Sequence, residues 1–396
     1  MTQRSFRLLV VSHAADGTGA PISTLALTRE WAKRSDVEVK VLLRRDGPLR
    51  SVFDEIAETF VFRPKPHFGL TDALRLALSG QPLLALKGLR NPDRPYILSV
   101  VEAKRADRLR WAIHEFEPDA IYVSTTHCGD ALEPMKLTAP ILTHVREMKN
   151  VIAALDASRR TFALLHSSAF AAVSQAVSDT LTGDWGVDPA LVQMEHPAID
   201  VESLTTQASE PCSMKLPEGP FIVGVGSLIE RKGPDLFLEL AARSKRQALP
   251  FHFIWLGDGP MAFTLQEAAE QMGVDDVLTW AGQVENPYAI IKQAQALALT
   301  SREDPHPRTM IEAAALSVPT VAFQGAGGAD IFLAKYEAGQ CVPMEDAAAM
   351  LTALEAISIN SKTSARVRED FATAASATRL LERLKALSVA EAHSPD

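Results

Sequence analysis

The sequence predicts an α/β protein that is built from two Rossmann-like domains. An apolar strand, a loop of small residues, a helix and a second strand follow one another over residues 6–43. The same succession begins again at residue 221, after a Pro-containing stretch at 211–220. Strands that alternate with helices are typical of parallel sheets with helices on their faces. Two copies of this pattern in 396 residues predict two domains, each large enough for its own core.

The first strand, residues 6–12, is followed by a loop that contains Gly17, Gly19, Ala20 and Pro21. We expect the next helix over residues 24–33 and the next strand over residues 37–43. The loop lacks the G-x-G-x-x-G spacing of dinucleotide-binding proteins, which disfavours an NAD-dependent dehydrogenase. Small residues before a helix let a ligand approach the free N–H groups there, although they equally suit a tight packing turn.

A basic loop opens the second domain, between a strand at 221–225 and a helix at 235–242. Its sequence, GSLIERKGP, places Arg231 and Lys232 beside a helix N-terminus, with Gly226 and Gly233 on either side. Fixed cations next to free backbone N–H groups suit a diphosphate. The alternative interpretation is a solvated pair of basic side chains.

An acidic stretch lies further along the second domain, in the sequence ALTSREDPHPRTMIEAAALSVP at 298–319. It links an apolar strand to a helix that begins near Arg308, and its prolines keep the loop out of helix. Asp304 lies eight residues before Glu312, and Glu303 precedes it. Carboxylates accept hydrogen bonds from hydroxyls, so the pair above a strand end predicts a sugar-binding site. The alternative is that Glu303 and Asp304 only cap the helix.

Two more loops of the second domain follow predicted strands. The strand at 252–256 leads into the turn Gly257-Asp258-Gly259-Pro260, and the strand at 320–323 leads to the adjacent Gly327 and Gly328. Backbone N–H groups in a Gly-rich loop can hold a phosphate or a sugar.

In the first domain, the strand at 141–143 leads to His144, Arg146 and Glu147. Ligands of open α/β sheets bind outside the carboxyl ends of the strands, so these three side chains are candidates to face an acceptor. The alternative is a surface histidine beside an Arg–Glu pair.

The basic loop, the G-D-G-P turn, the Asp304–Glu312 spacing and the paired glycines together resemble the family 4 glycosyltransferases. The resemblance covers most of residues 6–389 and is strongest over 221–345. It implies the GT-B fold, in which two Rossmann-like domains face each other across a cleft. It further implies an acceptor-side domain at 1–205, a nucleotide-sugar-binding domain at 206–370, and a C-terminal helix at 371–396 that crosses back to the first domain.

The resemblance also implies roles for single residues. Lys232 and Arg231 would stabilise the leaving diphosphate, Asp304 would contact the sugar, and Glu312 would contact the ribose. Asp304, Glu312 and His144 are the expected catalytic residues. The expected donor-binding residues are Gly19, Ala20, Gly226, Arg231, Lys232, Asp258, Glu303, Asp304, Glu312, Gly327 and Gly328.

Three positions bear on how far the resemblance extends. Most relatives have Arg directly after the first Gly of the basic loop, where this chain has Ser227, and we expect Arg231 to compensate. Most relatives have Glu where this chain has Asp304. Relatives often carry a His in the 144–147 segment as a wall of the active site, and either His144 or Arg146 takes that place.

Charge and composition limit the function further. The net charge is −9, and residues 201–396 carry all of it, because residues 1–200 contain 24 Lys and Arg against 24 Asp and Glu. An acidic second half argues against nucleic-acid binding. No apolar run reaches the ~20 residues of a membrane span. The three cysteines are far apart, which predicts a reducing, cytoplasmic compartment. Residues 70–110 combine apolar residues with many arginines, which suits either solvated helices or peripheral contact with the inner membrane surface.

Taken together, the resemblance implies a retaining glycosyltransferase of polysaccharide or glycoconjugate biosynthesis. Its donor substrate would be a nucleotide-diphosphate sugar, it would need no cofactor and no metal, and its acceptor would be a glycan, a lipid-linked molecule or a small molecule. One alternative is another GT-B enzyme, such as a sugar-nucleotide epimerase or a phosphorylase. The other is a non-catalytic nucleotide-sugar-binding homologue, which Ser227 and Asp304 favour.

Overall fold

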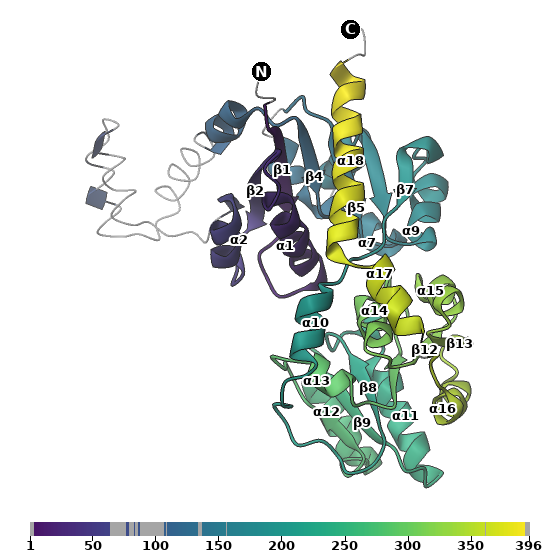
Figure 1. Cartoon of the computed structure of the whole chain (residues 1–396). Coiled ribbons are helices and arrows are strands. Elements are labelled where there is room, and N and C mark those ends of the chain that lie inside the picture. Colours follow the sequence, from purple (N-terminus) through teal and green to yellow (C-terminus); the bar gives the residue numbers. More distant parts are fainter. Residues whose placement is uncertain are drawn as a thin grey trace.

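The computed structural model consists of two parallel β-sheets, each covered by helices (Figure 1). It describes residues 4–63, 77–78, 83, 86–87, 107, 109–133, 137–155, 157–360 and 362–392. The GT-B-like arrangement of two Rossmann-like domains, which the sequence predicts, is confirmed.

The first sheet has seven strands in the order β3-β2-β1-β4-β5-β6-β7, and every pair of neighbours is parallel. The strands are β1 (Phe6–Ser12), β2 (Val37–Arg45), β3 (Glu58–Arg63), β4 (Ala120–Val123), β5 (Ile141–Val145), β6 (Ala169–Ala172) and β7 (Val192–Met194). The helices include α1 (Gly19–Ala32), α2 (Arg50–Ile56), α6 (Gly129–Leu132), α7 (Lys149–Ala153), α8 (Ala157–His166) and α9 (Gln175–Asp179).

The second sheet has six strands in the order β10-β9-β8-β11-β12-β13, again all parallel. The strands are β8 (Phe221–Val225), β9 (His252–Leu256), β10 (Leu278–Trp280), β11 (Ala296–Leu299), β12 (Thr320–Phe323) and β13 (Gly339–Val342). The helices are α11 (Pro234–Arg246), α12 (Ala262–Met272), α13 (Tyr288–Ile291), α14 (Arg308–Ala315), α15 (Ala329–Tyr336), α16 (Ala347–Ala356) and α17 (Thr363–Asp370).

Both sheets have the strand order of a doubly wound fold. The order reverses between β1 and β4 in the first sheet and between β8 and β11 in the second. Loops that leave neighbouring strands on opposite sides of such a switch point diverge and leave a crevice at the carboxyl edge. Each sheet therefore places a candidate ligand site at its own switch point.

The chain passes between the two sheets at two adjacent places. The first passage leads through α10 (Val201–Gln207), so the predicted domain boundary at 205/206 falls inside this helix. The second leads from α17 to α18 (Thr373–Ala392), and the N–H of Ile199 donates to the carbonyl of Phe371 at 2.8 Å. The last helix, yellow in Figure 1, lies against α1, where the indole of Trp31 donates to the carbonyl of Ala377 at 2.8 Å.

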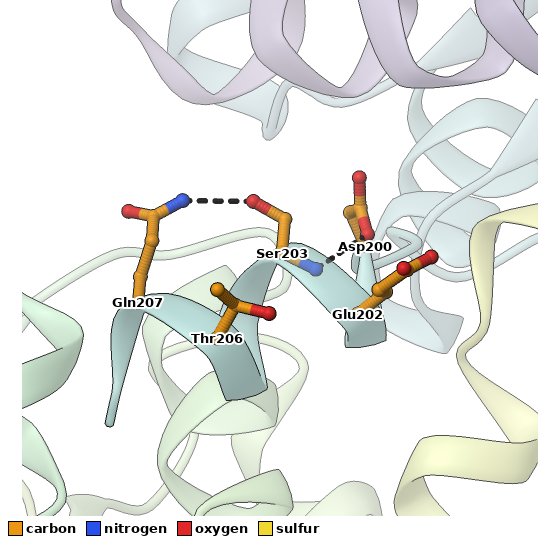
Figure 2. A pocket seen from close by; sticks show the side chains of 5 residues that line it. All are labelled: Asp200, Glu202, Ser203, Thr206 and Gln207. Atoms are coloured by element: carbon orange, nitrogen blue, oxygen red, sulfur yellow. Dashed lines mark hydrogen bonds between the residues drawn. The ribbon is translucent and has the colours of Figure 1, made fainter. Parts of the chain in front are cut away.

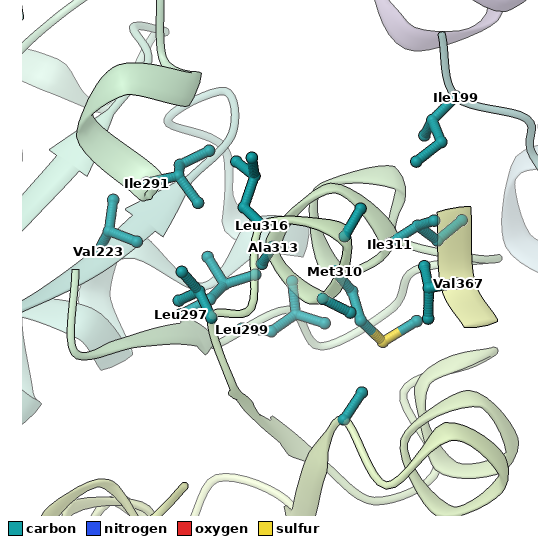
Figure 3. Close-up of a cluster of buried hydrophobic side chains, with 14 of the residues drawn as sticks. Ile199, Val223, Ile291, Leu297, Leu299, Met310, Ile311, Ala313, Leu316 and Val367 are labelled. Carbon is teal, nitrogen blue, oxygen red and sulfur yellow. The ribbon is translucent and has the colours of Figure 1, made fainter. Parts of the chain in front are cut away.

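A buried apolar cluster supports the acidic stretch of the second domain. Helix α14 buries Met310, Ile311 and Ala313. Figure 3 shows this face of the helix against side chains of β11, among them Leu297 and Leu299. Because the helix is fixed by this packing, the position of its polar side chains and of the loop before it is fixed too.

Among the described residues, no helix combines the length and the apolarity that crossing a bilayer requires. The predicted membrane-surface segment at 70–110 lies almost entirely outside the described residues.

Candidate active site

The basic loop of the second sheet is held against the end of β11. Residues Glu230–Lys232 form a single 3-10 turn that ends at Gly233, whose φ of +62° is left-handed. A Cβ at this position would lie 2.1 Å from the carbonyl oxygen of Thr300, so only glycine fits so close to the β11 loop. The conformation brings Arg231 and Lys232 to the switch point between β8 and β11.

The basic and acidic loops contact each other directly. The ammonium of Lys232 forms an ion pair with the carboxylate of Asp304, and the Lys232 and Asp304 side chains are 20% and 7% exposed. The guanidinium of Arg231 donates to the carbonyl of Glu303 at 2.6 Å. The aliphatic part of Lys232 packs on Gly226, where a Cβ would lie 3.4 Å from it. The structure thus brings together five of the predicted site residues.

The paired glycines complete this edge of the sheet. Gly327 has a φ of +145°, and a Cβ on it would lie 1.8 Å from the carbonyl oxygen of Asp304. The N–H of Asp304 donates to the carbonyl of Ala326 at 2.7 Å, and Gly328 donates back to the carbonyl of Asp304 at 3.3 Å. A Cβ on Gly328 would also lie 3.1 Å from Ser174 of the first domain. The glycines therefore position Asp304 and allow the two domains to approach.

Glu312 lies in α14, apart from the Lys232–Asp304 pair. It is 5% exposed, and its Oε1 accepts from the hydroxyl of Tyr288 at 3.1 Å and lies 2.8 Å from Nε of Arg308. Burial raises the pKa of Glu312, while Arg308 and the Tyr288 hydroxyl act in the opposite direction. Glu312 is thus a buried acceptor that both neighbours orient.

Arg302 anchors the acidic loop and has no counterpart in the sequence-based prediction. Its guanidinium donates to both carboxylate oxygens of Asp235, at 2.9 and 2.6 Å, and it also pairs with Glu345. Hydrogen bonding from Arg302 lowers the pKa of Asp235, and the same bond raises the pKa of Arg302. Arg302 therefore fastens the loop to α11.

The prediction that His144 faces an acceptor is wrong. His144 is 1% exposed, because β5 extends to Val145 and includes it. Its Nδ1 lies 2.8 Å from the hydroxyl of Tyr122, and its Nε2 lies 2.9 Å from the carbonyl oxygen of Glu195. Burial holds the pKa of His144 well below its usual range. Arg146 turns inward as well, toward Tyr122 and His144.

Two other histidines lie at the carboxyl edge of the first sheet. His13 follows β1 and His127 follows β4, and their ring centroids are 6.1 Å apart. Glu147, which follows β5, places Oε1 3.4 Å from Nδ1 of His127. Applied to every strand end, the same rule that selected residues 144–147 would have found both histidines. Within the described parts of the chain, no group of three or more His, Cys, Asp or Glu side chains is arranged to hold a metal ion.

A pocket of about 720 Å³ lies between the two domains. One wall belongs to the first domain and the other to the basic and acidic loops. Across it, the amide of Asn150 donates to the carboxylate of Glu303 at 2.8 Å. The lining residues are His127, Asn150, Val151, Ala154, Leu155, Glu230, Arg231, Arg302 and Glu303.

A smaller pocket of about 250 Å³ lies along α10 (Figure 2). Its lining contains two carboxylates, of Asp200 and Glu202, and no basic side chain. Asp200 accepts from the N–H of Ser203 at 3.0 Å, and the amide of Gln207 donates to Ser203 at 2.7 Å. This pocket does not suit an anionic ligand.

The remaining predicted donor residues lie near the carboxyl ends of β1 and β9. Gly19 and Ala20 begin α1, directly after the loop that carries His13. The carboxylate of Asp258 accepts from the N–H of Gly259 at 2.7 Å, and its carbonyl accepts from Leu228 at 3.1 Å. Asp258 thus holds its own turn against the basic loop and keeps an exposed side chain.

The sheet that carries the ion pair matches a known family. Residues 212–373 match the family described as glycosyl transferases group 1. This segment contains the basic loop, the acidic stretch and the paired glycines. It spans the second sheet and stops short of the first.

Solved structures show the same fold over nearly the whole chain. Anabaena HepE in complex with UDP has a TM-score of 0.70 and 17% identity, and the match covers 96% of this chain and 100% of that one. A glycosyltransferase from Rickettsia africae has a TM-score of 0.68 and 14% identity, covering 97% and 99%. The chain has the GT-B fold.

Curated relatives match over shorter stretches. The lipopolysaccharide core biosynthesis glycosyltransferase LpsE of Rhizobium meliloti is 26% identical over 153 residues, which cover 38% of this chain and 43% of that protein. An N-acetylgalactosaminyltransferase of Campylobacter jejuni, named for a diphospho-undecaprenol-linked acceptor, is 23% identical over 177 residues, or 45% and 47%. The chain spans less than half the length of these two relatives.

Proposed function

We propose that this protein is a glycosyltransferase that transfers a sugar from a nucleotide-diphosphate donor to a hydroxylated acceptor. The observation that carries the proposal is the contact between Lys232 and Asp304 at the β8–β11 switch point. A cation and a carboxylate lie side by side there at a helix N-terminus, and this combination supports binding of a diphosphate and of sugar hydroxyls. The match of residues 212–373 to group 1 glycosyl transferases and the UDP bound to Anabaena HepE support this assignment.

In the proposed complex, the diphosphate replaces Asp304 as the partner of Lys232. Arg231, whose guanidinium donates to the carbonyl of Glu303, supplies a second positive charge and compensates for the arginine that most relatives have at the position of Ser227. These cations stabilise the negative charge that develops on the leaving diphosphate. Asp304 is then free to accept hydrogen bonds from the sugar hydroxyls, and Glu312 accepts from the ribose.

We further propose retention of the anomeric configuration, a role in polysaccharide or glycoconjugate biosynthesis, and a cytoplasmic location. The resemblance of the motifs to family 4 enzymes supports the first, and the curated relatives support the second. The three free cysteines, Cys128, Cys212 and Cys341, support the third. Product analysis by NMR tests retention, and it also distinguishes transfer from epimerisation, which needs no acceptor.

Lys232→Ala tests the donor site. We expect it to weaken the binding of a nucleoside diphosphate at least tenfold, about 1.4 kcal/mol, because the ammonium that faces the phosphates is lost. Calorimetry with UDP, GDP and ADP on the wild-type protein identifies the base first, and the same nucleotide is then titrated into the variant.

Lys245→Ala is the matched control. Lys245 lies in the same domain, at the end of α11, where it pairs with Asp276 on the surface. We expect this variant to bind like the wild type. Equal affinity of wild type and Lys232→Ala would contradict the phosphate role, and a wild-type protein that binds no nucleoside diphosphate would contradict the proposed function.

A further inference from the structure

Arg302 lines the pocket between the domains, as Arg231 of the basic loop does. Its positive charge is already matched within the protein. The guanidinium donates from Nη1 and Nη2 to the two carboxylate oxygens of Asp235, at 2.9 and 2.6 Å, and from Nε to the carboxylate of Glu345. Because two carboxylates pair with one guanidinium, Arg302 has no unbalanced positive charge to offer to an anionic ligand.

A further contact of Arg302 reaches the basic loop itself. Nη1 also donates to the carbonyl of Glu230 at 2.9 Å, and Glu230 begins the 3-10 turn Glu230–Lys232, here called the basic turn. Four of the five N–H groups of the guanidinium thus have partners, on three segments: the basic turn, the first turn of α11 and the loop between β13 and α16. A lysine could not make all these contacts, because its ammonium lacks the planar fork.

The chain just after β11 holds the basic turn through other groups too. The backbone N–H of Arg302 donates to the carbonyl of Arg231 at 2.9 Å. The hydroxyl of Thr300 donates to the carbonyl of Lys232 at 3.2 Å. All three carbonyls of the basic turn therefore accept hydrogen bonds from this one segment, and Arg302 donates to two of the three.

We propose that Arg302 is a positioning residue of the donor site. It binds no phosphate itself, and instead holds the basic turn so that Arg231 and Lys232 together meet the two phosphates of a nucleoside diphosphate. This inference rests on the proposed function and deepens it, because the preference of the site for a diphosphate over a monophosphate then depends on a side chain that makes no contact with the ligand.

The preference depends on the position of the turn for a physical reason. Hydrogen bonds from cations to phosphate weaken steeply beyond about 3 Å, so two cations must be held in place to contact two phosphates. A monophosphate lacks the second phosphate and gains less from the pair of cations. The proposed ribose contact, Glu312, belongs to α14 and is held by Tyr288 and Arg308. A shift of the basic turn should therefore weaken binding of the second phosphate and leave the ribose contact intact.

The test compares the affinity for a nucleoside diphosphate with the affinity for the monophosphate of the same base, by calorimetry on the full chain. The base is the one that the wild-type protein binds most tightly among UDP, GDP and ADP. The variants are Arg302→Lys, which keeps the charge, and Arg302→Gln, which removes it. Arg243→Lys is the matched control, because Arg243 also pairs with a carboxylate of α11, that of Glu239, but does not contact the basic turn through this pair.

We expect both Arg302 variants to lower the preference for the diphosphate by about fivefold or more, and to change the affinity for the monophosphate less than about twofold. Arg243→Lys should keep the preference of the wild type. A direct contact of Arg302 with phosphate would be preserved by lysine, which also binds phosphate. A preference in Arg302→Lys that stays within about fivefold of the wild type would therefore overturn the positioning role. Equal losses of affinity for both nucleotides, which a merely structural role predicts, would overturn it too.

Asp235→Asn tests the same contact from the side of its partner, and it does not require Arg302→Gln to fold. Asparagine offers one acceptor oxygen where aspartate offers two, so the preference for the diphosphate should fall in Asp235→Asn as well. In the Arg302→Lys background, where the fork is already lost, Asp235→Asn should lower the preference less than it does in the wild type. Additive losses would show that Asp235 acts independently of Arg302 and would overturn the inference.

The outcomes for the wild-type protein separate this inference from the proposed function. A wild-type protein that binds no nucleoside diphosphate would contradict the proposed function, and the inference would fall with it. A wild-type protein that prefers the diphosphate, with a preference that Arg302→Lys retains, would contradict the inference alone.

Discussion

The switch points of the two sheets correspond strand for strand, yet they carry different chemistry. In the second sheet, the loops after β8, β11 and β12 supply Lys232, Asp304 and Gly327, and in the first sheet the loops after β1, β4 and β5 supply histidines and a glutamate. The carboxyl edge of the second sheet, here called the second edge, is charged, and its loops are in close backbone contact; the carboxyl edge of the first sheet is the first edge. The first edge offers two imidazoles, and the buried carboxylate of Glu147 lies 3.4 Å from that of His127. The same architecture thus provides two chemically different edges, and residues of both line one pocket.

The comparison shows that the loops of the two edges are held in place by different kinds of contact. In the second sheet, glycines allow close approach to the backbone of neighbouring loops, as Gly233 does to Thr300 and Gly327 to Asp304. In the first sheet, the carboxylate of Glu147 accepts hydrogen bonds from the backbone N–H groups of Thr126 and Arg146. We therefore expect substitution of a glycine to disturb the second edge most. At the first edge, substitutions that change the hydrogen-bonding groups of side chains should have the larger effect.

The largest effect is expected for Gly327→Ala. The added Cβ would lie 1.8 Å from the carbonyl oxygen of Asp304, at a φ of +145° that L-residues rarely adopt. We expect the loop to shift at a cost of about 3 kcal/mol or more, with a lower melting temperature and loss of nucleotide binding. Thermal unfolding and calorimetry measure the two effects.

Gly325→Ala is the control for this substitution, because Gly325 also has a positive φ, of +72°, but nothing lies within 4 Å of a Cβ there. Only the backbone penalty of about 1 kcal/mol is expected. If the two variants lost stability and nucleotide affinity to a similar extent, the effect of Gly327→Ala would come from its positive φ and not from contact with Asp304.

The next largest effect is expected for Glu312→Gln. The carboxylate accepts from Tyr288 and lies beside Arg308, and in the proposed complex it accepts from the ribose. Replacing a charged acceptor by an amide should lower turnover about 10- to 100-fold, or ~1.5–3 kcal/mol, while the fold survives. Near-normal turnover with the cognate nucleotide sugar would contradict the ribose assignment.

The same variant tests the electrostatics of the site. Burial raises the pKa of Glu312 above its ordinary 4.5, so the folded state holds this proton more tightly than the unfolded state. Stability is then lost as the pH rises from the ordinary carboxyl range through the raised pKa. Glutamine does not ionise, so the stability of Glu312→Gln relative to the wild type should increase over this window. Urea unfolding of both proteins at several pH values measures this relative stability. A difference in stability that does not change with pH would contradict the raised pKa of Glu312.

The sequence predicted the contact between the basic and acidic loops because its determinants are local. Lys232 and Gly233 are adjacent, and Asp304 and Glu312 lie within one loop and helix, so their chemistry is visible in short motifs. The order of strands then brings the two motifs together at the switch point. What the sequence did not indicate is Arg302, whose partners Asp235 and Glu345 lie 67 and 43 residues away.

The first edge was predicted less well because its residues are scattered. His13, His127 and Glu147 come from three separate loops, and none forms a motif with its neighbours. The error at His144 has a simple cause: β5 is two residues longer than predicted, and the histidine side chain turns into the core toward Tyr122. Because the strand continues past His144, its side chain lies on one face of the sheet instead of projecting from a loop.

The smallest effect is expected for Asn150→Ala, which removes the hydrogen bond that joins the two edges. The amide of Asn150 donates to Glu303 at 2.8 Å, and both groups are partly exposed to solvent. Because water can replace the amide, the loss should be within about 1 kcal/mol, less than about fivefold in turnover. Asn150→Asp should be worse than Asn150→Ala, since it places a second carboxylate opposite Glu303 and opposes approach of the domains. If Asn150→Ala lowered turnover more than Asn150→Asp, packing of the Asn150 side chain, and not its charge relation to Glu303, would connect the two edges.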